Sequence, residues 1–397
     1  MKNILVIILL LPAFVFAQKG YKVTGHIYGS PDGMKVYMKS EGISKKPVDD
    51  STTIKNGVFK FSGMLEAPVL VKLILDKTPK GEKSSASTWL ASNFYLDNSD
   101  ITYTGKLDSL PTYYYKRNAI SVPPTVKGSP AQDESVKFNE DVIGLKKELA
   151  KTDEEYMNVY HLPAMEGTFH TAEGIALANK YNDLSEKILN NTMDYIHKNP
   201  KSIIAFDQAY YAMEGYTTTL SIPQIDDLVN TIKSGWEGTY NMNVLMDAST
   251  HARKTAIGIK YQDFEFTTPE GKKVMLSTYV PKGKIVMLEF WASWCGPCRA
   301  EIPHLKHLNE TKSDEFSIVS ISLDENDASW KKAMKDEGMV WTQVVDYKGF
   351  EGEISKAYNI VGIPHSLILD REGRIMKVGL RGAFLDAYLE KMKAENK

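Results

Sequence analysis

Short stretches in which hydrophobic and polar residues alternate fill the first part of the chain. The first covers residues 21–28 and reads Tyr-Lys-Val-Thr-Gly-His-Ile-Tyr. Because successive side chains of a strand point to opposite faces of a sheet, this pattern predicts a strand with one buried face. Similar stretches, divided by Gly, Pro, Asn and Asp, follow at residues 34–38, 57–63, 67–75, 92–96 and 101–105. Their spacing predicts an antiparallel β-sandwich, which we place at residues 18–128.

Near residue 129 the pattern changes to long segments with a hydrophobic residue every three or four positions. These segments predict helices over residues 134–156, 173–198, 201–213 and 222–234. Asn199-Pro200 and Ile222-Pro223 mark helix boundaries, because proline cannot continue a helix that precedes it. Hydrophobic residues at this spacing form a core more often than a cofactor site. We therefore interpret residues 129–256 as a helical connector domain with a structural role, partner binding being the alternative.

From residue 257 onward, predicted strands alternate with predicted helices. A strand, a turn and a second strand span residues 259–276, and nearly continuous apolar runs follow at 284–291 and 316–324. Such runs are typical of strands that are buried on both faces of a sheet. Further strands are expected at 340–345, 361–370 and 374–379, and helices after residue 298 and at 328–337, 354–358 and 383–393. Residues 257–397 thus predict an α/β domain with helices on both faces of a mixed sheet.

The chain of 397 residues contains two cysteines, Cys295 and Cys298, spaced as Cys-Gly-Pro-Cys. They follow a buried strand and open a helix. The free N–H groups and partial positive charge at a helix N-terminus favour a thiolate over a thiol, so Cys295 is placed to be a nucleophile. Cys298 lies one turn further and can attack a mixed disulfide formed on Cys295. The spacing therefore indicates dithiol–disulfide exchange.

Two cysteines can also form half of a zinc site, and His304 and His307 lie nearby in the sequence. On a helix that begins at Cys298, however, His304 is about 9 Å away along the axis. Zinc ligands must converge to within about 2.3 Å of the metal. We therefore predict no metal site and expect both histidines to be ordinary surface residues of the helix.

Residues 289–298, Glu-Phe-Trp-Ala-Ser-Trp-Cys-Gly-Pro-Cys, closely resemble the active-site segment of thioredoxins. In that family an acidic residue precedes the first cysteine by six positions and a proline follows the second by five, which here are Glu289 and Pro303. Glu289 replaces the more usual aspartate. The resemblance implies that Glu289 exchanges a proton with Cys298, a role that requires burial to raise its pKa. It also places Trp294 beside the site.

A second resemblance lies at Val361-Gly362-Ile363-Pro364, which directly precedes an apolar run. Together with the cysteine motif, it resembles the cis-proline loop of thioredoxins. Proline is the residue for which a cis peptide bond costs little, and we expect one between Ile363 and Pro364. The resemblance further implies that the Ile363 backbone faces Cys295 and pairs with an extended substrate chain.

The order of the predicted domains resembles that of one group of proteins. The strand pair at residues 259–276 is similar to the start of exported thioredoxin-like reductases related to the peroxiredoxins, the TlpA/ResA-like group, although Gln262 replaces their usual proline. The first domain, with Val23-Thr24-Gly25 and the Gly128-Ser129 junction, resembles the domain of unknown function that precedes this module in proteins of Bacteroidetes type. This second resemblance implies an architecture but no activity.

The N-terminal residues have the pattern of a secretory signal peptide. A short basic segment, Met1-Lys2-Asn3, precedes an apolar run over residues 4–16 and the small residue Ala17. Residues 1–17 suit cleavage before Gln18, and the run is short for a membrane span, with an uncleaved anchor as the alternative. No cysteine follows the cleavage point, which argues against a lipid anchor. We expect the protein in the periplasm or cell envelope.

The resemblances imply an exported thiol:disulfide oxidoreductase whose only redox group is the Cys295–Cys298 pair, with no other cofactor. Gly296-Pro297 is the dipeptide of thioredoxin-type reductants, which favours reduction of protein disulfides. The expected partners are a disulfide-containing substrate protein and a membrane thiol electron donor. The net charge of −2, with mixed signs, gives no indication of nucleic-acid binding. A disulfide oxidase or isomerase, a thiol peroxidase and a cell-envelope binding module with accessory thiol chemistry remain as alternatives.

Overall fold

The computed structural model describes residues 20–114, 121–214 and 219–395. The predicted signal peptide lies outside these residues. The chain divides into two compact units, the first ending at Val136 and the second beginning at Lys137. Helix α1 (Pro130–Tyr156) spans the division between them. The predicted boundaries of four segments are not tested by this division and stay predictions.

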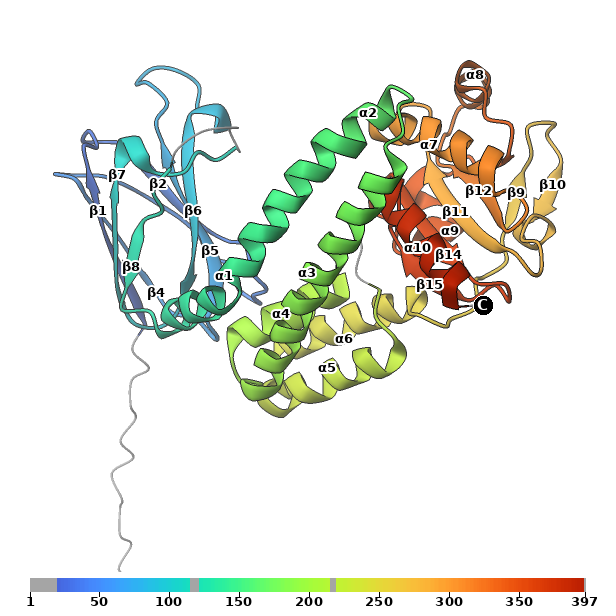
Figure 1. Ribbon diagram of the computed structural model, residues 1–397. Helices are drawn as coiled ribbons and strands as arrows, with labels where there is room; N and C mark the ends of the chain where they lie inside the picture. The colour runs from blue at the N-terminus through green and yellow to red at the C-terminus, as the bar shows by residue number, and fades with distance from the viewer. Residues whose placement is uncertain (1–19, 115–120, 215–218, 396–397) are drawn as a thin grey trace, which may run out of the picture. The chain divides into compact units, whose positions relative to one another are not determined.

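The first unit contains two four-stranded sheets that share one hydrophobic core (Figure 1). One sheet has the order β4-β1-β7-β8 and the other β3-β2-β5-β6. The strands are β1 (Tyr21–Tyr28), β2 (Lys35–Ser40), β3 (Asp49–Thr53), β4 (Val58–Gly63), β5 (Val69–Asp76), β6 (Trp89–Leu96), β7 (Asp100–Lys106) and β8 (Thr125–Lys127). All six predicted strands are present, and the β-sandwich is confirmed.

The sandwich differs from the prediction in one pairing and two strands. Strands β1 and β7 run parallel, and the chain between them forms β4 of the same sheet and β2, β3, β5 and β6 of the other. The sandwich is therefore not antiparallel throughout. The sequence analysis missed β3, which reads Asp-Asp-Ser-Thr-Thr and has no buried residue, and the three-residue strand β8.

Helix α1 begins four residues earlier than predicted, at Pro130. Ser129 is the residue before it, and its Oγ accepts a hydrogen bond from the N–H of Gln132 at 3.1 Å. The buried carboxylate of Asp97 accepts bonds from Ser129 Oγ and from the N–H of Ala131. These acceptors satisfy N–H groups that the first turn of a helix leaves free. Capping by a residue distant in sequence explains the early start.

Helices form the predicted connector, which comes first in the second unit (Figure 1). They are α1, a π-helical segment (Met157–His161), α2 (Leu162–Met165), α3 (Thr171–Lys198), α4 (Ile203–Glu214), α5 (Ile222–Trp236) and α6 (Tyr240–Ala252). The sequence analysis missed the π-helical segment, α2 and α6. Polar residues interrupt the hydrophobic period of α6, and its start is fixed by Thr239, whose Oγ1 accepts from the N–H of Met242.

The remainder of this unit is a seven-stranded mixed sheet in the order β10-β9-β13-β12-β11-β14-β15. Its strands are β9 (Glu265–Thr267), β10 (Lys273–Met275), β11 (Ile285–Trp291), β12 (Phe316–Ser322), β13 (Thr342–Val345), β14 (His365–Leu369) and β15 (Ile375–Val378). The helices are α7 (Gly296–Lys312), α8 (Asp327–Glu337), α9 (Glu353–Ala357) and α10 (Gly382–Glu395). Helices α7, α8 and α10 contribute to the core on one face, and α9 to the core on the other. The predicted α/β fold is confirmed.

The connector packs against the face of α7 that contains His304 and against α10. Tyr160 from the π-helical segment donates to Asp386 Oδ2 at 3.3 Å, and His304 Nε2 lies 3.0 Å from the same oxygen. His304 is 3% exposed, so the prediction that it is a surface residue is wrong. The helical pattern of α7 did not reveal that the connector covers this face. His307, half-buried, stacks on Phe169.

Within the described residues, no helix has the length and hydrophobicity needed to cross a membrane.

Candidate active site

The two cysteines lie where β11 gives way to α7 and are joined in a disulfide. Cys295 is the N-cap residue of α7, and its Sγ accepts a hydrogen bond from the N–H of Cys298 at 3.1 Å. Both residues are buried. When the disulfide is reduced, the same N–H and the helix dipole are placed to stabilise a thiolate on Cys295. The geometry therefore supports Cys295 as the nucleophile, a role that stays a prediction.

The turn that carries Cys295 is held by an aspartate that the sequence analysis did not single out. Asp324, buried after the end of β12, accepts a hydrogen bond from the N–H of Ser293 at 2.8 Å and another from the Ser293 hydroxyl. It also accepts from the hydroxyl of Ser322. A buried carboxylate with several donors is well satisfied and fixes their positions. Asp324 thus anchors the segment two residues before the nucleophile.

Glu289 lies on β11, between Ser320 of β12 and Ser366 of β14. Burial raises the pKa of its carboxyl to about 8, an increase strengthened by the nearby charge of Glu301 and opposed by a hydrogen bond with Ser320. Its Oε2 has no hydrogen-bond partner within the part of the chain that the structure describes. A carboxyl that changes protonation near neutral pH can accept and return a proton. The required rise in pKa is present.

The Ile363–Pro364 peptide bond is cis, as predicted. Pro364 directly precedes β14, which runs antiparallel to β11 and pairs His365 with Phe290. Phe290 lies at the end of β11 from which the chain continues into the cysteine turn. The sheet therefore brings the loop before Pro364 to the same edge as Cys295. Pairing of a substrate chain with Ile363 stays a prediction.

The two tryptophans of the motif differ in burial. Trp291 is fully buried in the core beneath the turn, whereas Trp294 is 61% exposed. The ring of Trp294 lies 6.4 Å from that of Phe350, itself exposed. An exposed aromatic pair next to a reactive sulfur is suited to contact a partner surface. Gly296 and Pro297 form the first turn of α7, and open space surrounds Gly296.

Another buried carboxyl, that of Glu301 on α7, was also missed by the sequence analysis. Glu301 follows Cys298 by three residues, is 8% exposed and lies 3.9 Å from Nδ1 of His161 in the connector. It is the charge that raises the pKa of Glu289 further. The described residues hold no group of three or more His, Cys, Asp or Glu side chains arranged to bind a metal ion.

The fold and the dithiol turn define the class as a thioredoxin-like thiol–disulfide oxidoreductase domain. The profile of the AhpC/TSA family matches residues 257–378, and that of a domain of unknown function, DUF4369, matches residues 21–135. The thiol-disulfide oxidoreductase ResA of Bacillus thuringiensis subsp. konkukian is 34% identical over 129 residues, which are 32% of this chain and 72% of ResA. Through this domain the chain belongs to the ResA-like thiol-disulfide oxidoreductases.

Other relatives have related descriptions. The thioredoxin-like protein YneN of Bacillus subtilis is 32% identical over 30% of this chain and 69% of its own. Among solved structures, the thioredoxin domain of a thiol-disulfide oxidoreductase from Bacteroides vulgatus is 35% identical, with a TM-score of 0.32, covering 34% of this chain and 97% of that one. A thiol-disulfide oxidoreductase from Bacteroides fragilis is 30% identical, with a TM-score of 0.32, covering 34% and 98%.

Proposed function

We propose that this oxidoreductase works in the cell envelope and reduces disulfides of substrate proteins, with a membrane thiol donor restoring its own dithiol. The observation that carries the proposal is a dithiol, Cys295 and Cys298, at the turn that follows β11, together with a buried carboxyl, Glu289, on the same strand. Cys295 caps α7, and the carboxyl of Glu289 on β11 has a pKa of about 8. A nucleophile, a resolving thiol and a proton acceptor are the groups that disulfide exchange needs.

The cycle transfers two electrons, and one proton moves between Cys298 and Glu289. The Cys295 thiolate attacks one sulfur of the substrate disulfide, forms a mixed disulfide and releases the other substrate sulfur as a thiolate. Cys298 then gives its proton to the Glu289 carboxylate and attacks Cys295 Sγ, which closes the Cys295–Cys298 disulfide and releases the second substrate thiolate. The donor returns two electrons by the reverse exchange, and Glu289 returns the proton to Cys298.

The reducing direction rests on Gly296-Pro297, the dipeptide found between the cysteines of thioredoxin-type reductants. We would test it by measuring the equilibrium reduction potential of the pair in a glutathione or dithiothreitol buffer, with Cys295→Ser as the blank. A value below about −230 mV supports a reductase. A value between about −180 and −120 mV would instead make the protein an oxidase or isomerase. Absence of a two-electron titration would favour a binding module.

Export to the cell envelope is supported by the sequence of residues 1–17. Its test is the mass of the protein recovered from the envelope fraction of cells that express the full chain. We expect a mature chain that begins at Gln18. Recovery of the uncleaved chain in the membrane fraction would indicate an anchor, and recovery from the cytoplasm would contradict export.

A further inference from the structure

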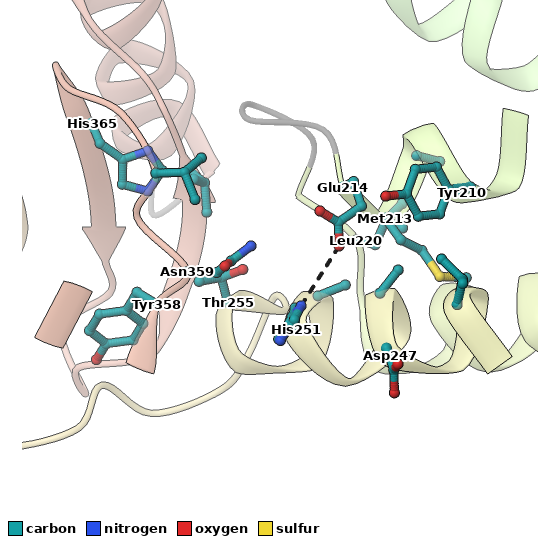
Figure 2. A pocket seen from close by; sticks show the side chains of 16 residues that line it. Tyr210, Met213, Glu214, Leu220, Asp247, His251, Thr255, Tyr358, Asn359 and His365 are labelled. Carbon is teal, nitrogen blue, oxygen red and sulfur yellow. Dashed lines mark ion pairs between the residues drawn. The ribbon is translucent and has the colours of Figure 1, made fainter. Parts of the chain in front are cut away.

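A cavity of about 340 Å³ lies within the second unit, between the connector and the loop that contains the cis peptide bond. Residues of helices α4 and α6, together with Leu220 and Thr255, form one side. The other side is formed by residues at the end of α9, in the loop before Pro364 and on β14 and β15. Figure 2 shows His365 on one side of this space and Tyr210, Glu214 and His251 on the other. We call it the connector groove.

The connector groove begins at the loop that we expect to pair with substrate. Val361, which is 75% exposed, and His365 both line it, and they flank Ile363-Pro364 in the chain. The Cα atoms of Ile363 and Val361 are two residues apart and so lie within about 7.6 Å of each other. An extended chain advances about 3.3 Å per residue. A substrate chain paired with Ile363 can therefore reach the connector groove within two or three residues.

The lining of the connector groove is apolar with an acidic side. Hydrophobic side chains from both domains contribute to it, among them Met213, Leu220 and Val378. Its two carboxylates are Glu214 and Asp247, and the described lining residues include no lysine or arginine. His251 lies 3.8 Å from Glu214 but is 44% exposed, so this pair is only weakly held.

Two further observations agree with a negative field in the connector groove. The pKa of the Tyr210 hydroxyl is raised by burial and by the charge of Glu214. On the opposite side, burial lowers the pKa of His365 to about 4, so its imidazole is neutral at pH 7 and supplies no compensating charge. The connector groove thus favours a ligand with apolar surface and a positive charge.

We propose that the connector groove is a substrate subsite that binds the polypeptide segment flanking the target cysteine and selects segments with an apolar residue beside a lysine or arginine. The inference rests on the proposed disulfide reduction and adds its substrate class. The apolar side chain packs between α4 and β15, and the cationic one pairs with Glu214 and Asp247. The connector then contributes directly to substrate choice.

The test uses the full chain, reduced beforehand, and single-turnover release of a quencher linked to a peptide through a disulfide. Two peptides differ only in the residues three and four positions from the cysteine, which are Leu-Lys in one and Leu-Glu in the other. Bis(2-hydroxyethyl) disulfide, which has no flanking chain, reports the dithiol chemistry alone. The variants are Glu214→Gln/Asp247→Asn, the charge reversal Asp247→Lys, and, as a matched control, Glu186→Gln/Asp194→Asn on the exposed surface of α3.

We expect the unmodified chain to reduce the Leu-Lys peptide about threefold to tenfold faster than the Leu-Glu peptide, the effect of two partly exposed ion pairs. The double variant in the connector groove loses this preference, Asp247→Lys, which sets a cation beside Glu214, loses it as well, and the control on α3 keeps it. All variants reduce the small disulfide at the same rate. Equal rates for both peptides in the unmodified chain, or a preference that survives in the double variant, would overturn the proposal. Failure to reduce the small disulfide faster than Cys295→Ser would overturn the proposed function itself.

Discussion

Glu289 lies in an environment that a carboxyl does not prefer. It is a carboxyl on a central strand, 5% exposed, with one oxygen that has no hydrogen-bond partner among the described residues. Keeping such a group charged is costly, and the raised pKa reflects that cost. The resemblance to thioredoxins predicted this residue and its burial. The sequence did not reveal Glu301, because the burial of a residue on a helix depends on which neighbour covers that face.

The stability of the oxidised protein should depend on pH through Glu289. The pKa of its carboxyl is about 8 in the folded protein against 4.5 for an exposed carboxyl in the unfolded chain, so between these pH values the folded state holds the extra proton. Stability is therefore fully present below about pH 4.5 and falls as the pH rises toward about 8. At pH 7 the loss is about 3 kcal/mol. Urea unfolding at pH 5, 6, 7 and 8 measures it.

Glu289→Gln removes the titrating group. As the pH rises, the free energy of unfolding of the variant should therefore increase relative to that of the unmodified protein. Glu372→Gln, at an exposed turn, is the control and should leave the pH dependence unchanged. A Glu289→Gln protein that loses stability with pH as steeply as the unmodified protein would show that the carboxyl is already ionised at neutral pH.

The elements that were predicted well have a pattern that is visible within a single segment. Strand β1 alternates buried and more exposed residues along its whole length, and β11 is an apolar run between the two cores of its sheet. The elements that were missed depend on contacts with distant residues. Strand β3 is held by pairing with β2, and the π-helical segment is fixed by the packing of Tyr160 against α10. Such contacts leave no local signature in the sequence.

The packing of α3 against the π-helical segment and α10 should be sensitive to a single methyl group. A Cβ added to Gly174 would lie 2.3 Å from Cδ2 of Tyr160 and 2.8 Å from Cβ of Ala383, and both neighbours are buried. We expect Gly174→Ala to lower the free energy of unfolding by about 1–3 kcal/mol, because the Tyr160 ring and Ala383 must shift. Denaturant unfolding of the oxidised protein measures the change.

Gly144 on α1 is the matched control, since a Cβ added there meets nothing within 4 Å. Gly144→Ala should raise the free energy of unfolding by about 0.5–1 kcal/mol, the usual gain in an exposed helix interior. If both variants were stabilised alike, α3 would not pack as closely against Tyr160 as the structure has it.

At the scale of the whole chain, the connector from Lys137 onward and the α/β domain belong to one compact unit. The hydroxyl of Tyr156 accepts a hydrogen bond from the N–H of Ala383, and Thr219 Oγ1 accepts one from the N–H of Val378 on β15. The sequence analysis placed a boundary near residue 257 because the hydrophobic pattern changes there from helices alone to strands alternating with helices. A change in the hydrophobic pattern shows where strands follow helices along the chain, but it does not show which surfaces are buried together.

This arrangement predicts that the connector stabilises the α/β domain without being needed for its chemistry. We expect residues 137–397 to fold alone and to reduce bis(2-hydroxyethyl) disulfide as fast as the full chain. Residues 257–397 should react at a similar rate but unfold more easily, by about 2–5 kcal/mol. Removing the connector leaves Asp386 and His304 without Tyr160 and exposes apolar surface on α10. Urea unfolding of both fragments measures the difference, and equal stability would mean that the connector adds none.

The fragment of residues 257–397 should also reduce the Leu-Lys and Leu-Glu peptides at equal rates, because it lacks Glu214 and Asp247. If it kept the preference, substrate selection would have to reside in the α/β domain itself.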